Sequence, residues 1–329
     1  MISSACPDEA KGVTPHAAGD IAETQLLLGE TATMIRPRRS MLFMPGSNAR
    51  AIEKARTLPA DGIILDLEDA VAPDAKAQAR AQIGEAVAAH GFGKREVLIR
   101  INGLDSPWWI DDLGMVAKAH PDGIVIPKVS SVKDLVAISD RLGDIRADHA
   151  IRVWAMIETP RGVLQAQEIA AQSRDSEMRL AGFIIGPNDI ARETRMRVTP
   201  GRPTMLPLLS QCVLAARAWG IEILDGVYNN FSDADGFARE CAQARDMGFD
   251  GKTLIHPSQI DACNAAFTPP DEEVAHAREI LGVFERPENA HLGVVQINGQ
   301  MVERLHAEIA KRTVAIADAI AATQVDRPA

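Results

Sequence analysis

Three carboxylates stand directly after an apolar run near the start of the regular part of the chain. Gly62–Leu67 is apolar except for Asp66, and Glu68 and Asp69 follow it, which places the three acids within four residues. An apolar run of this length predicts a strand buried on both faces. Carboxylates at the end of a buried strand are costly unless they are paired or bind a cation. The pattern favours a functional acidic cluster over a helix cap with surface charge.

Charged residues also close most of the other predicted strands. They are Arg100, Lys128, Glu158, Asp189, Asp225 and His256. In a barrel of parallel strands the C-terminal strand ends meet on one face, and active sites are built there. Residues of both signs on one rim indicate a site, in which some members form neutralising pairs or helix caps, and we expect Asp225 to stand behind the residues that contact ligand.

Glu158 and Asp189 close consecutive predicted strands and should be neighbours. Two adjacent carboxylates repel each other unless a proton or a cation lies between them. Without nearby His or Cys ligands a hard cation is the natural choice. Two carboxylates completed by water and substrate oxygens are typical of Mg²⁺, with Mn²⁺ as the alternative ion. The competing interpretation pairs the carboxylates with Arg161 and Arg192, and we favour the metal site.

Arg100 follows apolar residues, so we expect its planar guanidinium to point into the barrel mouth, where it suits a carboxylate or a thioester carbonyl. A salt bridge to Glu68 is the alternative, and both can hold at once. Because side chains alternate along a strand, Asp66 and Glu68 share one face and form an acidic wall beside Arg100, whereas Asp69 is assigned to the start of the next loop. We expect an ion pair for Lys128 rather than a Schiff base. His256 is predicted either to cap the next helix or to contact ligand.

About eight strand–helix units position these residues, which is the number in a (β/α)₈ TIM barrel of about 250 residues. The strands are predicted at 40–44, 62–67, 96–101, 123–126, 151–157, 180–185, 221–224 and 252–255. The helices are predicted at 49–58, 73–90, 107–119, 132–142, 206–219 and 234–247, with one more beginning at Gly162. A doubly wound open sheet is disfavoured because no G-x-G-x-x-G follows the first strand.

The chain is predicted to have three parts. Residues 1–35 have no clear period and form a flexible N-terminal tail, in which 21–28 could be a short helix. Residues 36–268 form the barrel, which is the catalytic domain. Residues 269–329 form a helical C-terminal extension, with helices at 271–284 and about 301–321 and an extended segment at 292–297 before a turn at Asn298-Gly299. This extension is too long for a ninth unit, so we expect a lid or an oligomer contact.

The composition restricts the partners. Of 329 residues, 46% are hydrophobic and 24% are charged, as in an ordinary globular protein. The formal net charge of −10 argues against nucleic acid or an anionic membrane as a partner. No apolar stretch is long enough to span a bilayer, and the N-terminal segment resembles neither a secretory signal nor a transit peptide. Four scattered cysteines suit reduced thiols, so we expect a cytoplasmic protein.

Seven short motifs follow one another from about residue 38. They are Arg39-Ser40-x-Leu42-Phe43-x-Pro45-Gly46, Leu65-Asp66-Leu67-Glu68-Asp69-Ala70-Val71, Arg100-Ile101-Asn102-Gly103, Ile126-Pro127-Lys128, Ile157-Glu158, Asn188-Asp189 and Gly251-Lys252-x-x-Ile255-His256-Pro257-Ser258-Gln259. Together they resemble the citrate lyase β-chain-like family, which includes malyl-CoA, β-methylmalyl-CoA and citramalyl-CoA lyases and malyl-CoA thioesterases. The segments Asn229-Asn230-Phe231 and Gly299-x-Met301-Val302-Glu303 also resemble the family.

The resemblance implies a barrel that holds Mg²⁺ on Glu158 and Asp189. It also implies that the substrate contacts Phe43, Lys54, Arg100, Asn188, Asp189, Ile255 and His256. Two positions depart from the family. Asn48 stands where members often carry a basic residue, which Arg50 could replace. Glu303 stands where family lyases place an Asp, on a C-terminal lid that reaches a neighbouring subunit.

The predicted function is a Mg²⁺-dependent lyase that cleaves a 3-hydroxyacyl-CoA, such as malyl-CoA, β-methylmalyl-CoA or citramalyl-CoA, into an acyl-CoA and a 2-oxo acid. Arg100 would stabilise the thioester enolate and Glu303 would transfer a proton at the α-carbon. The wall of Asp66 and Glu68 would support them. The alternative is hydrolysis of (3S)-malyl-CoA by the same site. A citrate lyase β-subunit and a non-catalytic acyl-CoA-binding protein are weaker hypotheses. We expect a homo-oligomer, a trimer or a hexamer, whose C-terminal lid is shared between subunits.

Overall fold

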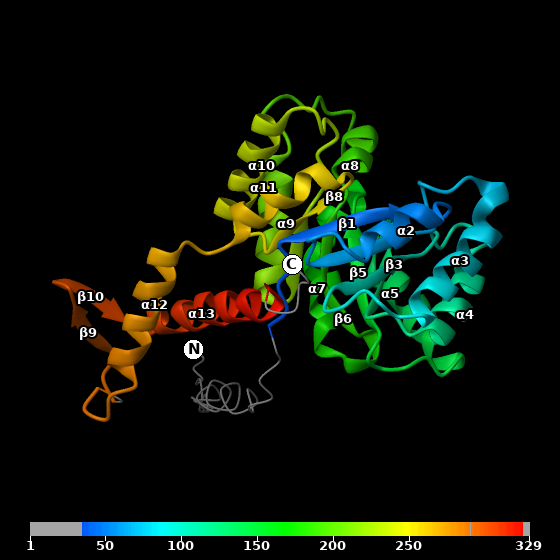
Figure 1. Cartoon of the computed structure of the whole chain (residues 1–329). Helices are drawn as coiled ribbons and strands as arrows, with labels where there is room; N and C mark the ends of the chain where they lie inside the picture. Colours follow the sequence, from blue (N-terminus) through cyan, green and yellow to red (C-terminus); the bar gives the residue numbers. More distant parts are fainter. Residues whose placement is uncertain (1–34, 290, 325–329) are drawn as a thin grey trace, which may run out of the picture. The chain divides into compact units, whose positions relative to one another are not determined.

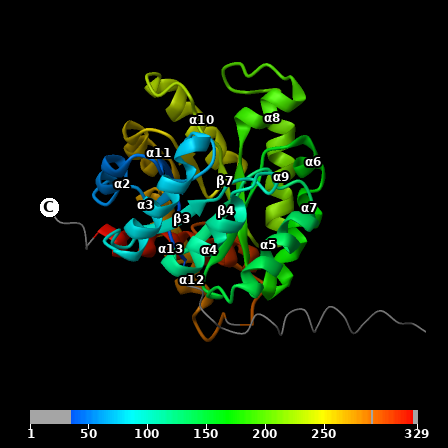
Figure 2. The same cartoon turned by 90° about the vertical axis from the view of Figure 1, so that its right-hand side faces the viewer.

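A closed barrel of eight parallel strands forms the core of the computed structural model, which describes residues 35–289 and 291–324. Each strand pairs with the next one in sequence. The strand β8, which lies beside β1 in Figure 1, closes the barrel by pairing with β1. The helices lie outside the strands (Figure 2). The strands are β1 (Ser40–Pro45), β2 (Gly62–Asp66), β3 (Glu96–Arg100), β4 (Gly123–Ile126), β5 (Arg152–Ile157), β6 (Leu180–Ile185), β7 (Glu222–Asp225) and β8 (Gly251–Leu254). The predicted TIM barrel is confirmed.

The helices of the barrel follow the predicted order, with differences at prolines. They are α2 (Ala49–Ala55), α3 (Lys76–Ala88), α4 (Trp109–Ala119), α5 (Val132–Asp144), α6 (Pro160–Leu164), α7 (Ala166–Ala171), α8 (Pro187–Thr194), α9 (Leu206–Ala218), α10 (Ala234–Met247) and α11 (Ile260–Phe267). The helix predicted from Gly162 is two short helices, α6 and α7. Pro73 begins a 3₁₀ turn before α3 instead of the helix itself. The prediction gave no bounds for α8 or for the helix that His256 could cap; Pro187 begins α8, and Pro257 begins a 3₁₀ turn before α11, since proline suits the first turn of a helix.

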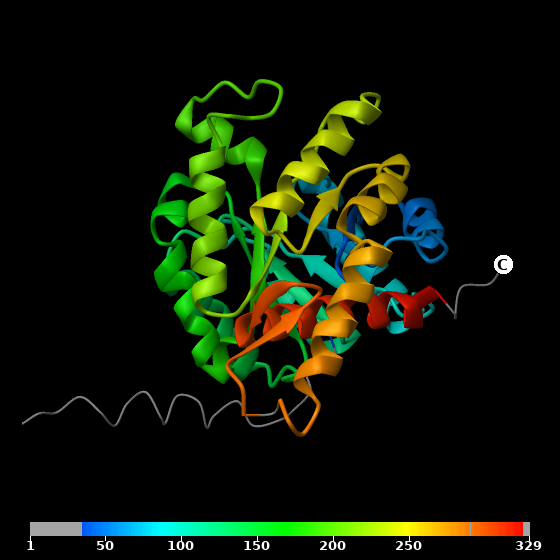
Figure 3. The same ribbon diagram turned by 90° about the vertical axis from the view of Figure 1, so that its left-hand side faces the viewer.

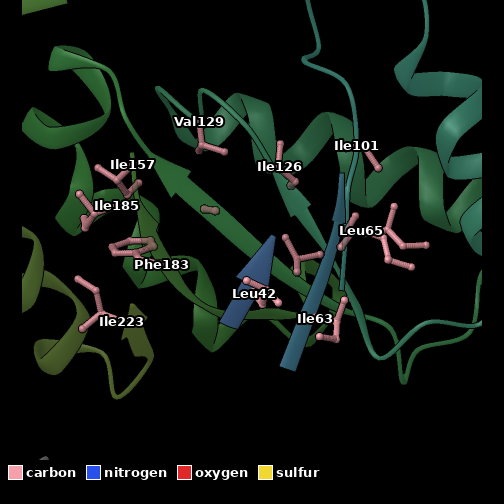
Figure 4. Packing of buried hydrophobic residues seen from close by; sticks show 14 of the residues in the cluster. Leu42, Ile63, Leu65, Ile101, Ile126, Val129, Ile157, Phe183, Ile185 and Ile223 are labelled. Atoms are coloured by element: carbon pink, nitrogen blue, oxygen red, sulfur yellow. The ribbon is translucent and has the colours of Figure 1, made fainter. Parts of the chain in front are cut away.

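Two layers of apolar side chains lie on the two faces of the strands. The interior layer consists of Met41, Ile64, Leu98, Val125, Trp154, Met156, Ile184 and Leu224. The residues between them point outward and form the larger cluster with the helices, part of which is shown in Figure 4. Because both faces are covered, the strands are apolar almost to their C-terminal ends.

The same alternation brings charged residues into the barrel mouth. Asp66 stands two positions after the interior residue Ile64, and Arg100 has the corresponding position in β3. Glu158 follows the interior residue Met156 by two positions. A strand rises about 3.3 Å per residue, so these side chains form the next layer toward the C-terminal ends.

Asp225 lies on the other face of the sheet, because the interior residue Leu224 directly precedes it. Its buried carboxylate accepts two hydrogen bonds from Arg202, at 2.8 and 2.9 Å, and one from Lys252 at 2.6 Å. Lys252 also donates to Glu240 of α10 at 2.8 Å. These four residues, the Asp225 cluster, neutralise one another. The structure therefore removes Asp225 from the predicted rim and assigns it to a structural ion-pair cluster.

The C-terminal extension contains α12 (Asp271–Phe284), the hairpin strands β9 (Val294–Ile297) and β10 (Gln300–Glu303), and α13 (Arg304–Gln324). α13 packs across α12, as Figures 1 and 3 show. With the hairpin they bury a cluster of their own, made of Ala277, Ile280, Phe284, Ile297, Val302, Ala307 and Ala310. The second helix begins later than predicted because residues 300–303 pair with β9 across a turn, in which Asn298 has a φ of 51°.

The predicted tail and its short helix at 21–28 lie outside the described residues, except for Ile35. Within the described part of the chain, no helix is both long enough and apolar enough to cross a membrane.

Candidate active site

A cavity of about 410 Å³ lies at the C-terminal ends of the barrel strands. Residues from the ends of β1, β2, β3, β5, β6 and β8 meet there. The predicted site residues that line it are Phe43, Asp66, Arg100, Glu158, Asn188, Asp189 and Ile255. The structure thus brings seven residues together from distant parts of the sequence.

Arg100 is held in place by two carboxylates. Its Nε and Nη2 donate to Asp66 at 2.7 and 2.6 Å, and its Nη1 lies 3.0 Å from Glu68 Oε2. The predicted salt bridge to Glu68 is therefore present together with a stronger pair to Asp66. Burial alone would lower the pKa of Arg100, but Asp66 and Glu68 raise it well above its usual value. The guanidinium is a fixed cation whose Nη1 is not used by Asp66.

Glu68 is buried between two cations. Lys128 Nζ donates to Glu68 Oε1 at 2.5 Å, which confirms the predicted ion pair of Lys128. Burial raises the pKa of Glu68 in spite of Arg100 and Lys128. The backbone of Lys128 has a φ of 56°, and its N–H donates to Glu158 Oε1 at 2.7 Å. Lys128 therefore links the acidic wall to Glu158.

Lys76 fixes the turn that follows β2, although no sequence pattern singles it out. Its buried Nζ donates to two consecutive carbonyls, those of Leu67 and Glu68, at 2.7 Å each. Asp66 closes the same turn by accepting from the N–H groups of Glu68 at 2.9 Å and Ala70 at 3.1 Å. These bonds determine the direction in which the acidic side chains of the turn point.

We expect Lys76→Met to lower the free energy of unfolding by about 2–4 kcal/mol, because two buried carbonyls would lose a charged donor. Urea unfolding followed by circular dichroism measures the change. Lys118→Met, at an exposed lysine of α4, is the matched control and should change it by no more than about 0.5 kcal/mol. Equal stability of the two variants would contradict the role assigned to Lys76.

Glu158 is a buried carboxyl group whose surroundings carry too little positive charge to stabilise its ionised form. Burial and the charge of Glu68 raise its pKa to about 8, with Asp189 adding to the rise and Arg100 opposing it. Gly186 leaves the space that the carboxylate needs, since a Cβ there would overlap Glu158 Oε2. Near neutral pH the group therefore holds a proton unless a cation takes its place.

Glu158 and Asp189 suit a divalent cation with oxygen ligands. Both line the cavity, and Asp189 Oδ1 also lies 2.6 Å from Arg192 Nη2, the ion pair predicted as the competing interpretation. Within the residues that the structure describes, no group of three or more His, Cys, Asp or Glu side chains could hold a metal. A bound ion would take its remaining ligands from water and substrate, a donor set that fits Mg²⁺.

Glu158→Gln should weaken Mg²⁺ binding by more than about 100-fold, since even residues behind the ligands contribute about 10- to 100-fold to metal affinity. Isothermal titration calorimetry of the wild type and the variant measures the effect without substrate. Glu168→Gln, at an exposed carboxylate of α7, is the control and should bind as the wild type does. Unchanged affinity in Glu158→Gln would contradict the metal assignment.

Four predicted residues are absent from the described lining of the cavity: Glu68, which is buried behind it, Lys54, His256 and Glu303. Lys54 is exposed in the last turn of α2. His256 caps a 3₁₀ turn by accepting from the N–H of Ser258, and its ring stacks on Phe231 at 4.8 Å between centroids. Glu303 is exposed at the end of β10. Their roles toward substrate stay predictions.

Asn48, which departs from the family pattern, caps a helix here. Its side chain accepts from the N–H of Ala51 at 3.1 Å and so begins α2. The neighbouring Arg50 is exposed in the first turn of the same helix. The capping function accounts for Asn48 without a ligand.

Several lining residues were not predicted from the sequence. Asp69 was assigned to the loop after the strand, yet it lines the cavity, as do Met156, Val227, Asn229 and Thr253. The strand period of two identifies Met156, because it precedes Glu158 on the same face. The other positions come from loop and strand-end contacts for which the sequence has no comparable signal.

Comparison with known proteins finds relatives over most of the chain. The family described as HpcH/HpaI aldolase/citrate lyase matches residues 39–257. A (3S)-malyl-CoA thioesterase of Cereibacter sphaeroides is 46% identical over 291 residues, which are 88% of this chain and 98% of the relative. The citrate lyase subunit beta of Escherichia coli is 36% identical over 273 residues, 82% of this chain and 89% of the relative.

Solved structures show the same likeness. The protein CitE from Mycobacterium tuberculosis, in complex with magnesium, acetoacetate and coenzyme A, has a TM-score of 0.67 at 27% identity. The match covers 85% of this chain and 97% of that one. The resemblance inferred from the motifs is confirmed, and the chain belongs to the HpcH/HpaI aldolase/citrate lyase family.

Proposed function

We propose that this chain hydrolyses the thioester of a 3-hydroxyacyl-CoA, with (3S)-malyl-CoA as substrate. The observation that carries the proposal is the 46% identity to a (3S)-malyl-CoA thioesterase over almost the whole of that protein. This supports the alternative from the sequence more than the lyase that was ranked first. Carbon–carbon cleavage is the second candidate, favoured by the 36% identity to a citrate lyase subunit.

Arg100 is the residue that would bind the thioester carbonyl. Asp66 occupies Nε and Nη2, and Nη1 lies 3.0 Å from Glu68 Oε2; since Nη1 carries two N–H groups, the second can donate to the carbonyl oxygen and to the negative charge that develops on it. The donor is already oriented and charged before substrate arrives. Phe43 and Ile255 offer apolar surface to the acyl-CoA chain at the cavity mouth.

Glu158 and Asp189 would hold Mg²⁺, or Mn²⁺ in its place. The bound ion would supply positive charge that binds and orients the acid end of the substrate. The complex of CitE with magnesium, acetoacetate and coenzyme A supports this assignment. Asn188 forms hydrogen bonds with Asn229 at 2.7 and 3.2 Å and so steadies the rim beside Asp189.

The working form would be a homo-oligomer, a trimer or a hexamer, in which Glu303 reaches the cavity of a neighbouring copy. Arg312, on the helix that follows Glu303, pairs at 2.7 Å with Asp250. Asp250 precedes β8 and so lies at the strand end opposite the cavity.

Beside Glu303 the extension exposes an apolar stripe to solvent. Its members are Val294, Met301, Leu305 and Ile309, which are 45%, 71%, 54% and 61% exposed.

Leu305→Glu should break the oligomer, because a carboxylate would be buried without a partner in the contact between copies. Size-exclusion chromatography with light scattering should show the mass falling to that of one chain. Lys311→Glu, at an exposed position further along α13, is the control and should keep the wild-type mass. An unchanged mass for Leu305→Glu would contradict the shared extension.

Product analysis tests the proposed reaction. The purified protein is incubated with Mg²⁺, (3S)-malyl-CoA and phenylhydrazine, which traps 2-oxo acids, and the products are identified by mass spectrometry. Hydrolysis predicts free CoA and malate in equal amounts and no trapped glyoxylate. Acetyl-CoA with glyoxylate phenylhydrazone would favour the lyase instead, and no turnover would favour a non-catalytic binding protein.

A further inference from the structure

The cavity is lined by four carboxylates from the described part of the chain, and three of them have other partners or assignments. They are Asp66, Asp69, Glu158 and Asp189. Asp66 already accepts four hydrogen bonds, two from Arg100 and two from backbone N–H groups. Glu158 and Asp189 form the candidate cation site. Asp69 remains, and within the described residues it accepts no hydrogen bond.

Asp69 is also in the right place to act on the group that Arg100 binds. Its Oδ2 lies 4.0 Å from Arg100 Nη1, the nitrogen that would donate to the thioester oxygen. Its side chain is 62% exposed, so water reaches it. Glu68 and Ala70 on either side are fixed by their hydrogen bonds to Asp66, which holds Asp69 at the edge of the cavity.

We propose that Asp69 is the general base that activates water for thioester hydrolysis, an inference that rests on the proposed function. The water oxygen forms a bond to the carbonyl carbon while its proton passes to the Asp69 carboxylate. The electron pair of the C=O double bond moves to the oxygen, where Arg100 Nη1–H stabilises it. When that pair returns, the C–S bond breaks, and the thiolate of CoA takes the proton from Asp69.

The test compares full-length Asp69→Asn with the wild type and with Asp74→Asn. Asp74 is an exposed acid five positions further on, so its variant has the same change of charge outside the cavity. Thiol release from (3S)-malyl-CoA is measured in water alone and with hydroxylamine, a nucleophile that needs no base. In water we expect the kcat of Asp69→Asn to be about 10²–10⁴-fold lower than that of the wild type. Hydroxylamine should restore thiol release to within about tenfold of the wild-type rate with hydroxylamine, and Asp74→Asn should behave as the wild type does.

Three results would overturn the assignment. The first is wild-type hydrolysis by Asp69→Asn. The second is an equal loss in water and in hydroxylamine, which would mean that Asp69 acts through binding or site structure. The third is rescue by hydroxylamine in Glu303→Gln but not in Asp69→Asn, which would move the base to the C-terminal extension. If the wild type itself releases no malate, the proposed function fails first, so the two failures are distinguishable.

Discussion

Arg100→Met is expected to lower kcat/KM for (3S)-malyl-CoA by about 10²–10³-fold, the usual effect of removing one donor to a developing oxyanion. The expectation follows from Nη1, which is charged, fixed by the pair to Asp66 and not used by it. Steady-state thiol release over a range of substrate concentrations separates kcat from KM. Since the bond to oxygen strengthens as charge develops, most of the loss should fall on kcat.

Two further variants separate this effect from damage to the fold. Arg100→Lys keeps the charge but not the planar fork, and we expect an intermediate rate. Arg161→Met removes an exposed arginine of α6 close to Glu158 in sequence and should keep the wild-type rate. A rate for Arg100→Met within about threefold of the wild type would contradict the assigned function.

Lys252→Met is expected to give the largest loss of stability, about 3–5 kcal/mol, because it leaves excess negative charge beside the fully buried Asp225. Lys252 is 0% exposed and donates to both Asp225 and Glu240. Urea unfolding at neutral pH measures the change. Arg245→Met, which removes an exposed pair to Asp246 on α10, is the matched control and should cost less than about 1 kcal/mol.

The pH dependence of stability offers a second measurement on the same cluster. Burial alone would raise the pKa of Asp225, but Lys252 and Arg202 hold it below its usual value. A carboxyl whose pKa is lowered on folding stabilises the protein above its unfolded pKa, about 4, and this contribution disappears as pH falls through the folded pKa. Lys252→Met should therefore lose less stability than the wild type on acidification. If the free energies of unfolding of the two proteins fell in parallel with pH, the role assigned to the Asp225 cluster would be contradicted.

Much of the site could be predicted because the alternation of interior and exterior residues along each strand, its phase, is visible in the sequence. Asp66 and Glu158 each follow an interior apolar residue by two positions, so both face the cavity. Asp225 ends a strand as well, but Leu224 before it is the interior residue, and the same phase therefore turns Asp225 outward. If charged residues at strand ends are selected without regard to this alternation, the selection mixes active-site residues with members of structural ion pairs.

The contacts made after the strands end could not be predicted in this way. Lys76 reaches back across nine residues to the carbonyl of Leu67, and Asp69 depends on the turn that this contact fixes. Such contacts depend on three-dimensional placement and leave no period in the sequence. Glu303 is similar, since its distance from the cavity of its own chain depends on how the extension packs.

Oxygen-18 water tests the central proposal, thioester hydrolysis in this cavity, most directly. The protein is incubated with Mg²⁺ and (3S)-malyl-CoA in labelled water, and the released acid is analysed by mass spectrometry. Hydrolysis predicts malate with a single labelled oxygen, in the carboxyl group that was the thioester carbonyl, together with an equal amount of free CoA. Release of glyoxylate with acetyl-CoA, and no labelled malate, would contradict it.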